Sequence, residues 1–190
     1  MSRFVSILML PIIALLTLSF SFLKFMRTRD YQDMAKEIRA NVAKKMTKKH
    51  QMDWIGEGGG MMGSVYMVKL CFQIHHPLDR HEARERLVDC VEELLKAINS
   101  NEEIRPYLKY YPFTIKNVIV VIFSDYPDGR DVYDPYISVV SISESDHITF
   151  RTEEPGKRYG YKNTYLEPYS NALTMVKGET GRSFQLSKYR

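Results

Sequence analysis

Residues 65–98 predict a strand followed by a helix; they read VYMVKLCFQIHHPLDRHEARERLVDCVEELLKAI. Apolar side chains occupy every second position over residues 65–75, which is the period of a half-buried strand. The pattern then changes, because Asp79 can cap a helix and Glu82 follows three residues later, as in a capping box. Apolar residues repeat at helical spacing to the end of the stretch, so the helix should bury one face.

Three further strands and a second helix are expected downstream. Residues 114–124 are rich in β-branched side chains and predict a central strand, and residues 136–143 and 147–152 predict two more strands. Apolar residues at helical spacing predict a helix over residues 167–177. The order β-α-β-β-β-α predicts an α+β domain over residues 65–178, with an antiparallel or mixed sheet of about four strands and two helices on one face. Beyond it, residues 179–190 form a polar tail.

The beginning of the chain indicates where the domain resides. No charged residue occurs from Phe4 to Leu23, and about 20 apolar residues are enough for a helix to cross a bilayer. More Lys and Arg residues follow this run than precede it, which favours a single-pass anchor with the domain in the cytoplasm. The alternative is an export signal, cleaved near Ser19 and Ser21, that leaves the domain periplasmic or secreted. Residues 1–29 are thus a transmembrane anchor or a signal segment.

Residues 30–56 predict a basic juxtamembrane helix. The chain carries a net charge of +4, yet residues 24–49 hold nine Lys or Arg against three Asp or Glu. Apolar residues recur every three or four positions over residues 31–46, so they share one helix face. We expect the lysines to contact anionic lipid headgroups, although a charged spacer is an equal alternative; they are Lys44, Lys45, Lys48 and Lys49. No aromatic interleaving or recognisable module indicates nucleic-acid binding.

A glycine-rich segment, residues 57–64 (EGGGMMGS), follows this helix. Gly58, Gly60 and Gly63 have the G-x-G-x-x-G spacing of dinucleotide-binding loops. Those loops need a strand before them and a helix after them, so that a helix N-terminus faces the phosphates. Here the predicted order is reversed, with a helix before and a strand after. The segment therefore predicts a flexible hinge between the basic helix and the domain, and no cofactor is expected.

Histidines and carboxylates gather at the turn after the first predicted strand. His75, His76 and His81 lie close in sequence, and His81 and Glu85 share one helix face. Imidazole and carboxylate groups are zinc ligands, so His76, His81 and Glu85 are candidate metal ligands of a small metal-dependent enzyme. Helix capping and turn chemistry explain the same residue types without a metal.

Tyrosine is the second candidate for function, because the chain contains 13 of them and many fall in predicted loops. Tyrosine supplies a large contact area with a polar tip, and it is enriched at binding surfaces. Tyr126, Tyr133 and Tyr136 lie in or beside the loop SDYPDGRDVYDPY and are the predicted partner-binding residues. The alternative is that these rings only cover the open face and the edges of the sheet.

Taken together, the patterns favour a membrane-tethered, non-enzymatic module that binds a protein partner or associates with itself. No nucleophile elbow, zinc-protease helix or phosphate-binding loop occurs in the sequence, which lowers the expectation of an enzyme without excluding one. Two alternatives remain: an exported soluble binding protein, and the metal-dependent enzyme with a site at His75, His76 and His81.

Overall fold

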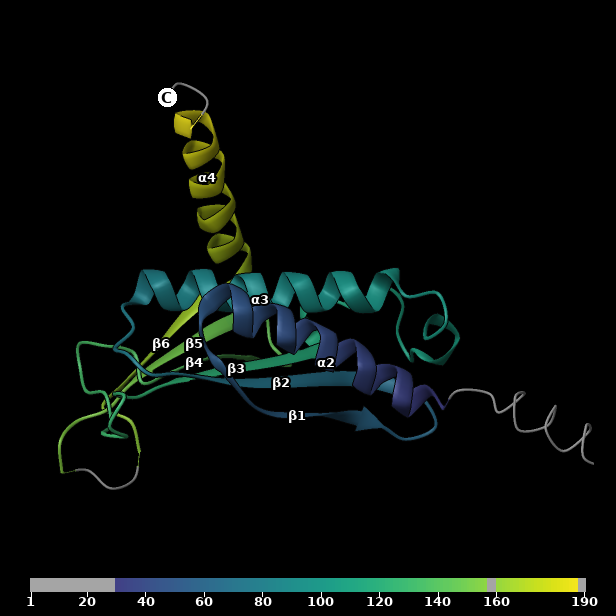
Figure 1. Cartoon of the computed structure of the whole chain (residues 1–190), viewed down its shortest axis with the longest axis horizontal. Helices are drawn as coiled ribbons and strands as arrows, with labels where there is room; N and C mark the ends of the chain where they lie inside the picture. The colour runs from purple at the N-terminus through teal and green to yellow at the C-terminus, as the bar shows by residue number, and fades with distance from the viewer. Residues whose placement is uncertain (1–29, 157–159, 188–190) are drawn as a thin grey trace, which may run out of the picture. The chain divides into compact units, whose positions relative to one another are not determined.

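The computed structural model describes residues 30–156 and 160–187, with side chains as far as residue 178. Six strands form one mixed sheet in sequence order (Figure 1), so the predicted α+β class is confirmed and the expected number of strands is too low. Only β2 and β3 are parallel, and every other neighbouring pair is antiparallel. The strands are β1 (Asp53–Met61), β2 (Val65–Ile74), β3 (Val118–Ser124), β4 (Val139–Ser143), β5 (His147–Thr152) and β6 (Asn163–Pro168).

The unit predicted from residues 65–98 is confirmed. The side chains of Val68, Leu70, Phe72 and Ile74 in β2 are fully buried, as their alternation indicates. Helix α3 (Arg80–Ser100) begins after Asp79, whose carboxylate accepts a hydrogen bond from a backbone N–H of the first turn at 2.8 Å. The helix crosses back over the sheet and connects the parallel pair β2 and β3.

The basic helix is a structural layer of the domain. Helix α2 (Tyr31–His50) lies beside α3 on the same face of the sheet (Figure 1) and packs on β1 and β2, while α3 packs on β3 and β4. The predicted helix is confirmed over Tyr31–His50, with Ala35, Ile38, Val42 and Met46 buried, whereas residues 53–56 of the predicted range 30–56 belong to β1. Their burial against the sheet also makes α2 part of the same core as α3.

The predicted glycine hinge is wrong for residues 57–61, which belong to β1 and pair with β2. The close approach of β2 explains these glycines. A Cβ atom on Gly59 would lie 2.6 Å from the backbone oxygen of Met67, and one on Gly60 would overlap the ring of Tyr66. Among the glycines of residues 57–64, only Gly63, at the turn between β1 and β2, has a positive φ, of 73°. The glycines therefore permit a close strand pairing.

The C-terminal elements differ from expectation in several places, and the strand expected over residues 136–143 begins only at Val139. The strand expected from residue 114 begins at Val118, because residues 115–117 form a 3₁₀ turn, η2. Edge strand β6 was not expected, because its side chains are mostly exposed on both faces and show no alternation. Helix α4 (Tyr169–Ser187) continues through Gly178, so the expected stop and the tail from residue 179 are wrong. Gly178 is not among the glycines with a positive φ, the conformation with which glycine ends a helix.

Replacing Gly59 with alanine should destabilise the fold, whereas the same change at Gly58 should not. A Cβ atom on Gly58 has no neighbour closer than the Cβ of Lys69 at 4.0 Å, while on Gly59 it meets backbone. We expect Gly59→Ala to lower the free energy of unfolding by about 1–3 kcal/mol and Gly58→Ala to change it by less than about 0.5 kcal/mol. Urea denaturation at equilibrium measures both, and two neutral variants would contradict the tight pairing of β1.

Candidate binding surface

Two loops that were predicted separately meet at the end of the sheet where β2 and β3 finish, and this end is called one edge of the sheet below. Strands β2 and β3 are parallel, so the loops that follow them leave from the same edge. The loop after β3, residues 125–138, is hydrogen-bonded to the turn after β2, since the N–H of Ile137 donates to the carbonyl of Leu78 at 2.8 Å. The histidine turn and the tyrosine loop therefore form one surface.

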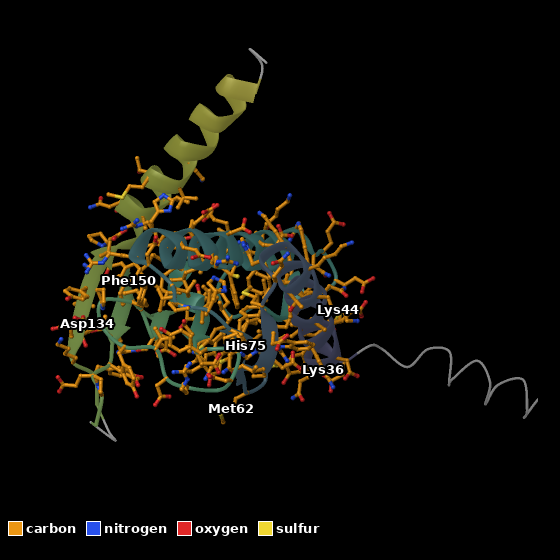
Figure 2. All side chains as sticks on the ribbon, turned by 60° about the vertical axis from the view of Figure 1, so that its left-hand side comes forward. Lys36, Lys44, Met62, His75, Asp134 and Phe150 are labelled. Atoms are coloured by element: carbon orange, nitrogen blue, oxygen red, sulfur yellow. The ribbon has the colours of Figure 1, made fainter. Side chains whose placement is uncertain are left out.

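His75 connects the ends of three strands at this edge, and Figure 2 shows its position. Its Nδ1 lies 2.6 Å from a carboxylate oxygen of Asp125, after β3, and its Nε2 lies 3.1 Å from one of Asp53, the first residue of β1. Gln73 donates to the second oxygen of Asp125 at 2.5 Å. Both ring nitrogens face carboxylates, so the imidazolium, which donates from both, suits the site best. The hydrogen bonds with Asp53 and Asp125 accordingly raise the pKa of His75.

This arrangement favours a structural role for His75. A general base needs a free ring nitrogen within reach of a substrate proton, and here a carboxylate faces each nitrogen. In this role, the histidine holds β1 and the start of the tyrosine loop to β2.

The structure does not bring the candidate metal ligands together. The Nε2 of His76 lies 3.0 Å from a carboxylate oxygen of Glu82, which Arg86 also binds. His81 and Glu85 are exposed near the start of α3. Among the described residues, no three His, Cys, Asp or Glu side chains come together in a way that could hold a metal ion. The two cysteines, Cys71 and Cys90, are free thiols.

The tyrosine loop presents a groove of about 440 Å³, lined by Tyr126, Gly129, Arg130, Asp131 and Tyr133. The guanidinium of Arg130 lies 5.2 Å from the ring centroid of Tyr126, and its Nε donates to Asp128 at 2.7 Å. Two of the three predicted tyrosines thus share one groove, and Tyr136, which is 43% exposed, lies further along the same loop. Aromatic, cationic and anionic groups therefore stand together on one surface.

The tyrosine loop is also held in place by its neighbours. The N–H of Asp134 donates to the carbonyl of Glu153 at 2.9 Å, and its carboxylate accepts from Lys162 at 3.1 Å and from Asn163 at 3.0 Å. Asp134 lies at the margin of the domain in Figure 2. At the other end, the N–H of Asp125 donates to the carbonyl of Ile74, the last residue of β2, at 3.0 Å. A loop fixed in this way loses little conformational entropy on binding.

The second face of the sheet lacks a helical cover among the described residues, since α2 and α3 both lie on the first face. On this second face, the side chains of β2 and β3 are half-buried or exposed; they are Lys69, Cys71, Gln73, Ile119, Val121 and Phe123. Sequence alternation identifies the buried face of each strand but does not show whether the opposite face is covered. The prediction of helices on one face of the sheet already left this second face open, although on β4 the side chains of Val139 and Ser141 are buried on it.

Two of the four lysines predicted to contact lipid form ion pairs between the helices. Lys45 pairs with Glu93 at 2.6 Å and Lys49 with Asp89 at 2.7 Å, both across the contact between α2 and α3. Lys44 and Lys48 are exposed, and lipid contact by the set stays a prediction. The predicted membrane span, residues 4–23, lies outside the residues that the structure describes. Among the described residues, no helix is long and apolar enough to cross a bilayer.

No family model matches the chain, and neither does any curated protein or solved structure.

The hydrogen bonds of His75 should stabilise the fold in acid and lose this effect in base. Because its pKa is raised above the ordinary 6.5, the stabilisation is complete below pH 6.5 and disappears as the pH rises through the raised pKa. We expect His75→Ala to lower the free energy of unfolding more at pH 5.5 than at pH 9. NMR titration of the ring should give a pKa above 6.5 that falls in Asp53→Asn. A native pKa at or below 6.5 would contradict the assignment.

Proposed function

We propose that the chain is a membrane-tethered, non-enzymatic module that binds a protein partner through its tyrosine loop. The main support for this proposal is the groove between Tyr126 and Tyr133. Hydrogen bonds at both ends fix the loop that forms this groove. Rigid tyrosines with a neighbouring arginine are the composition of energetically dominant contacts at protein interfaces. The partner is another protein or a second copy of this chain.

The position of α2 supports a tether at one end and binding at the other. The ring of Tyr31, the first residue of α2, stacks on Tyr107 with centroids 5.6 Å apart, and Leu108 pairs with Val65, where β2 begins. The tyrosine loop lies at the opposite edge, where β2 and β3 end. An anchor in residues 4–23 would thus hold the domain by the edge away from its groove, leaving the groove free for a partner.

Photo-crosslinking in intact cells of the source organism tests this function. A photoreactive amino acid is placed in the full chain at position 126, 133 or 136, and at Lys96, an exposed residue of α3, as the matched control. We expect the three loop positions to give the same discrete adduct in the membrane fraction and position 96 to give none. An adduct of twice the chain's mass would identify a second copy as the partner.

With the partner purified, the double variant Tyr133→Ala, Tyr136→Ala should bind at least about tenfold more weakly, because truncating a central aromatic residue costs more than 1 kcal/mol, and Lys96→Ala should bind normally. Equal labelling at all four positions, or unchanged affinity of the double variant, would contradict partner binding by the loop. N-terminal sequencing of the membrane-bound chain tests the anchor, and a mature start near Phe22 would show export instead.

A further inference from the structure

Exposed aromatic and apolar side chains gather at the edge of the sheet where β2 and β3 begin. Met62, at the turn between β1 and β2, is 86% exposed, more than any other large hydrophobic side chain of the described residues. Tyr107, Tyr110 and Tyr111, which follow α3, are 38%, 50% and 52% exposed. We call these four residues the amino-end surface.

Hydrogen bonding brings the two parts of the amino-end surface together. The N–H of Lys109 donates to the carbonyl of Val65 at 2.8 Å, so the tyrosine segment runs beside the start of β2, three residues after Met62. In Figure 2, Met62 projects away from the body of the domain. The stacking of Tyr31 on Tyr107 places the start of α2 at the same edge. Tyr31, the first residue of α2, therefore lies beside this surface.

Basic groups lie against the tyrosine rings of the surface. The guanidinium of Arg105 lies 5.0 Å from the ring centroid of Tyr111, and the Nζ of Lys109 lies 5.4 Å from that of Tyr110. Tyrosine rings favour the headgroup region of a bilayer, where the ring meets acyl chains and the hydroxyl meets water. Lysine and arginine beside them can reach lipid phosphates. Acidic residues also lie near these basic groups in the sequence, among them Glu102 and Glu103. Insertion of apolar side chains therefore contributes more to the contact with lipid than net charge does.

We propose that the amino-end surface rests in the headgroup region of a phospholipid bilayer, with Met62 inserted deepest. This inference rests on the proposed anchor, which would hold the surface at the membrane, so that even a weak intrinsic affinity suffices. Helix α2 is about 30 Å long, and Lys48 and Lys49 stand at its far end. Docking through the amino-end surface therefore lifts these lysines away from the bilayer. Membrane contact by the amino-end surface and membrane contact by the lysines of α2 thus exclude one another.

Depth-dependent fluorescence quenching on the full chain distinguishes these modes. The chain, with Cys71→Ser and Cys90→Ala, is reconstituted into phosphatidylcholine vesicles and, in parallel, into vesicles that also contain anionic phosphatidylserine. An environment-sensitive fluorophore is attached to a cysteine placed by Met62→Cys, Lys48→Cys or Asp128→Cys, the last on the opposite loop. We expect nitroxide-labelled lipid to quench the fluorophore at position 62 and to leave positions 48 and 128 unquenched. Because phosphatidylcholine carries no net charge, quenching at position 62 in its vesicles should persist in 1 M salt.

A further variant tests whether the tyrosines hold the surface at the bilayer. Adding Tyr110→Ser and Tyr111→Ser should reduce the quenching at position 62 to the level at position 128, while Tyr136→Ser should leave it unchanged. Quenching at position 48 in place of position 62 would overturn the proposal in favour of the α2 lysines.

Flotation of the same vesicles separates this inference from the proposed anchor. A chain that floats with the vesicles but has an unquenched position 62 overturns the docking alone. A chain that does not float overturns both the anchor and the docking.

Discussion

The burial of α2 against the sheet is the contact on which the rest of the structure depends. Met46 is 1% exposed and Ala35 is fully buried, although six lysines and arginines share this helix. Arg39 is also buried and pairs with Glu57 of β1 at 3.2 Å, which fixes the helix to the edge strand. Because α2 belongs to the core, the start of this helix and the tyrosine loop keep a fixed geometry across the domain. A free spacer followed by a hinge would have decoupled them.

The sequence predicts the β2–α3 unit well because its determinants are local: alternation in the strand, and a cap and stripe in the helix. It also predicts α2, but an apolar helix face has the same pattern whether it meets lipid or a sheet. Strand β1 is missed because its glycines have low strand propensity. What makes them suitable is the approach of Tyr66 and Met67, a contact that only the folded chain reveals.

The candidate binding surface is also predictable only in part, because its residues come from segments that are distant in sequence. Loop composition identifies Tyr126 and Tyr133, and the structure places both in one groove. Their proximity to the histidine turn follows from the parallel pairing of β2 and β3, which the sequence left open as antiparallel or mixed. His75 contacts Asp53, which is 22 positions away in the sequence, and Asp125, which is 50 positions away. No local sequence motif predicts contacts over such separations.

Hydrogen exchange of backbone amides in the full chain tests most directly whether α2 and β1 belong to the folded core. We expect the interior amides of α2, and the β1 amides that donate to β2, to exchange as slowly as those of α3, through global unfolding. Exchange of residues 31–61 within seconds, while β2 and α3 stay protected, would show a detached helix and a flexible hinge. That result would contradict the fixed connection between the start of α2 and the tyrosine loop.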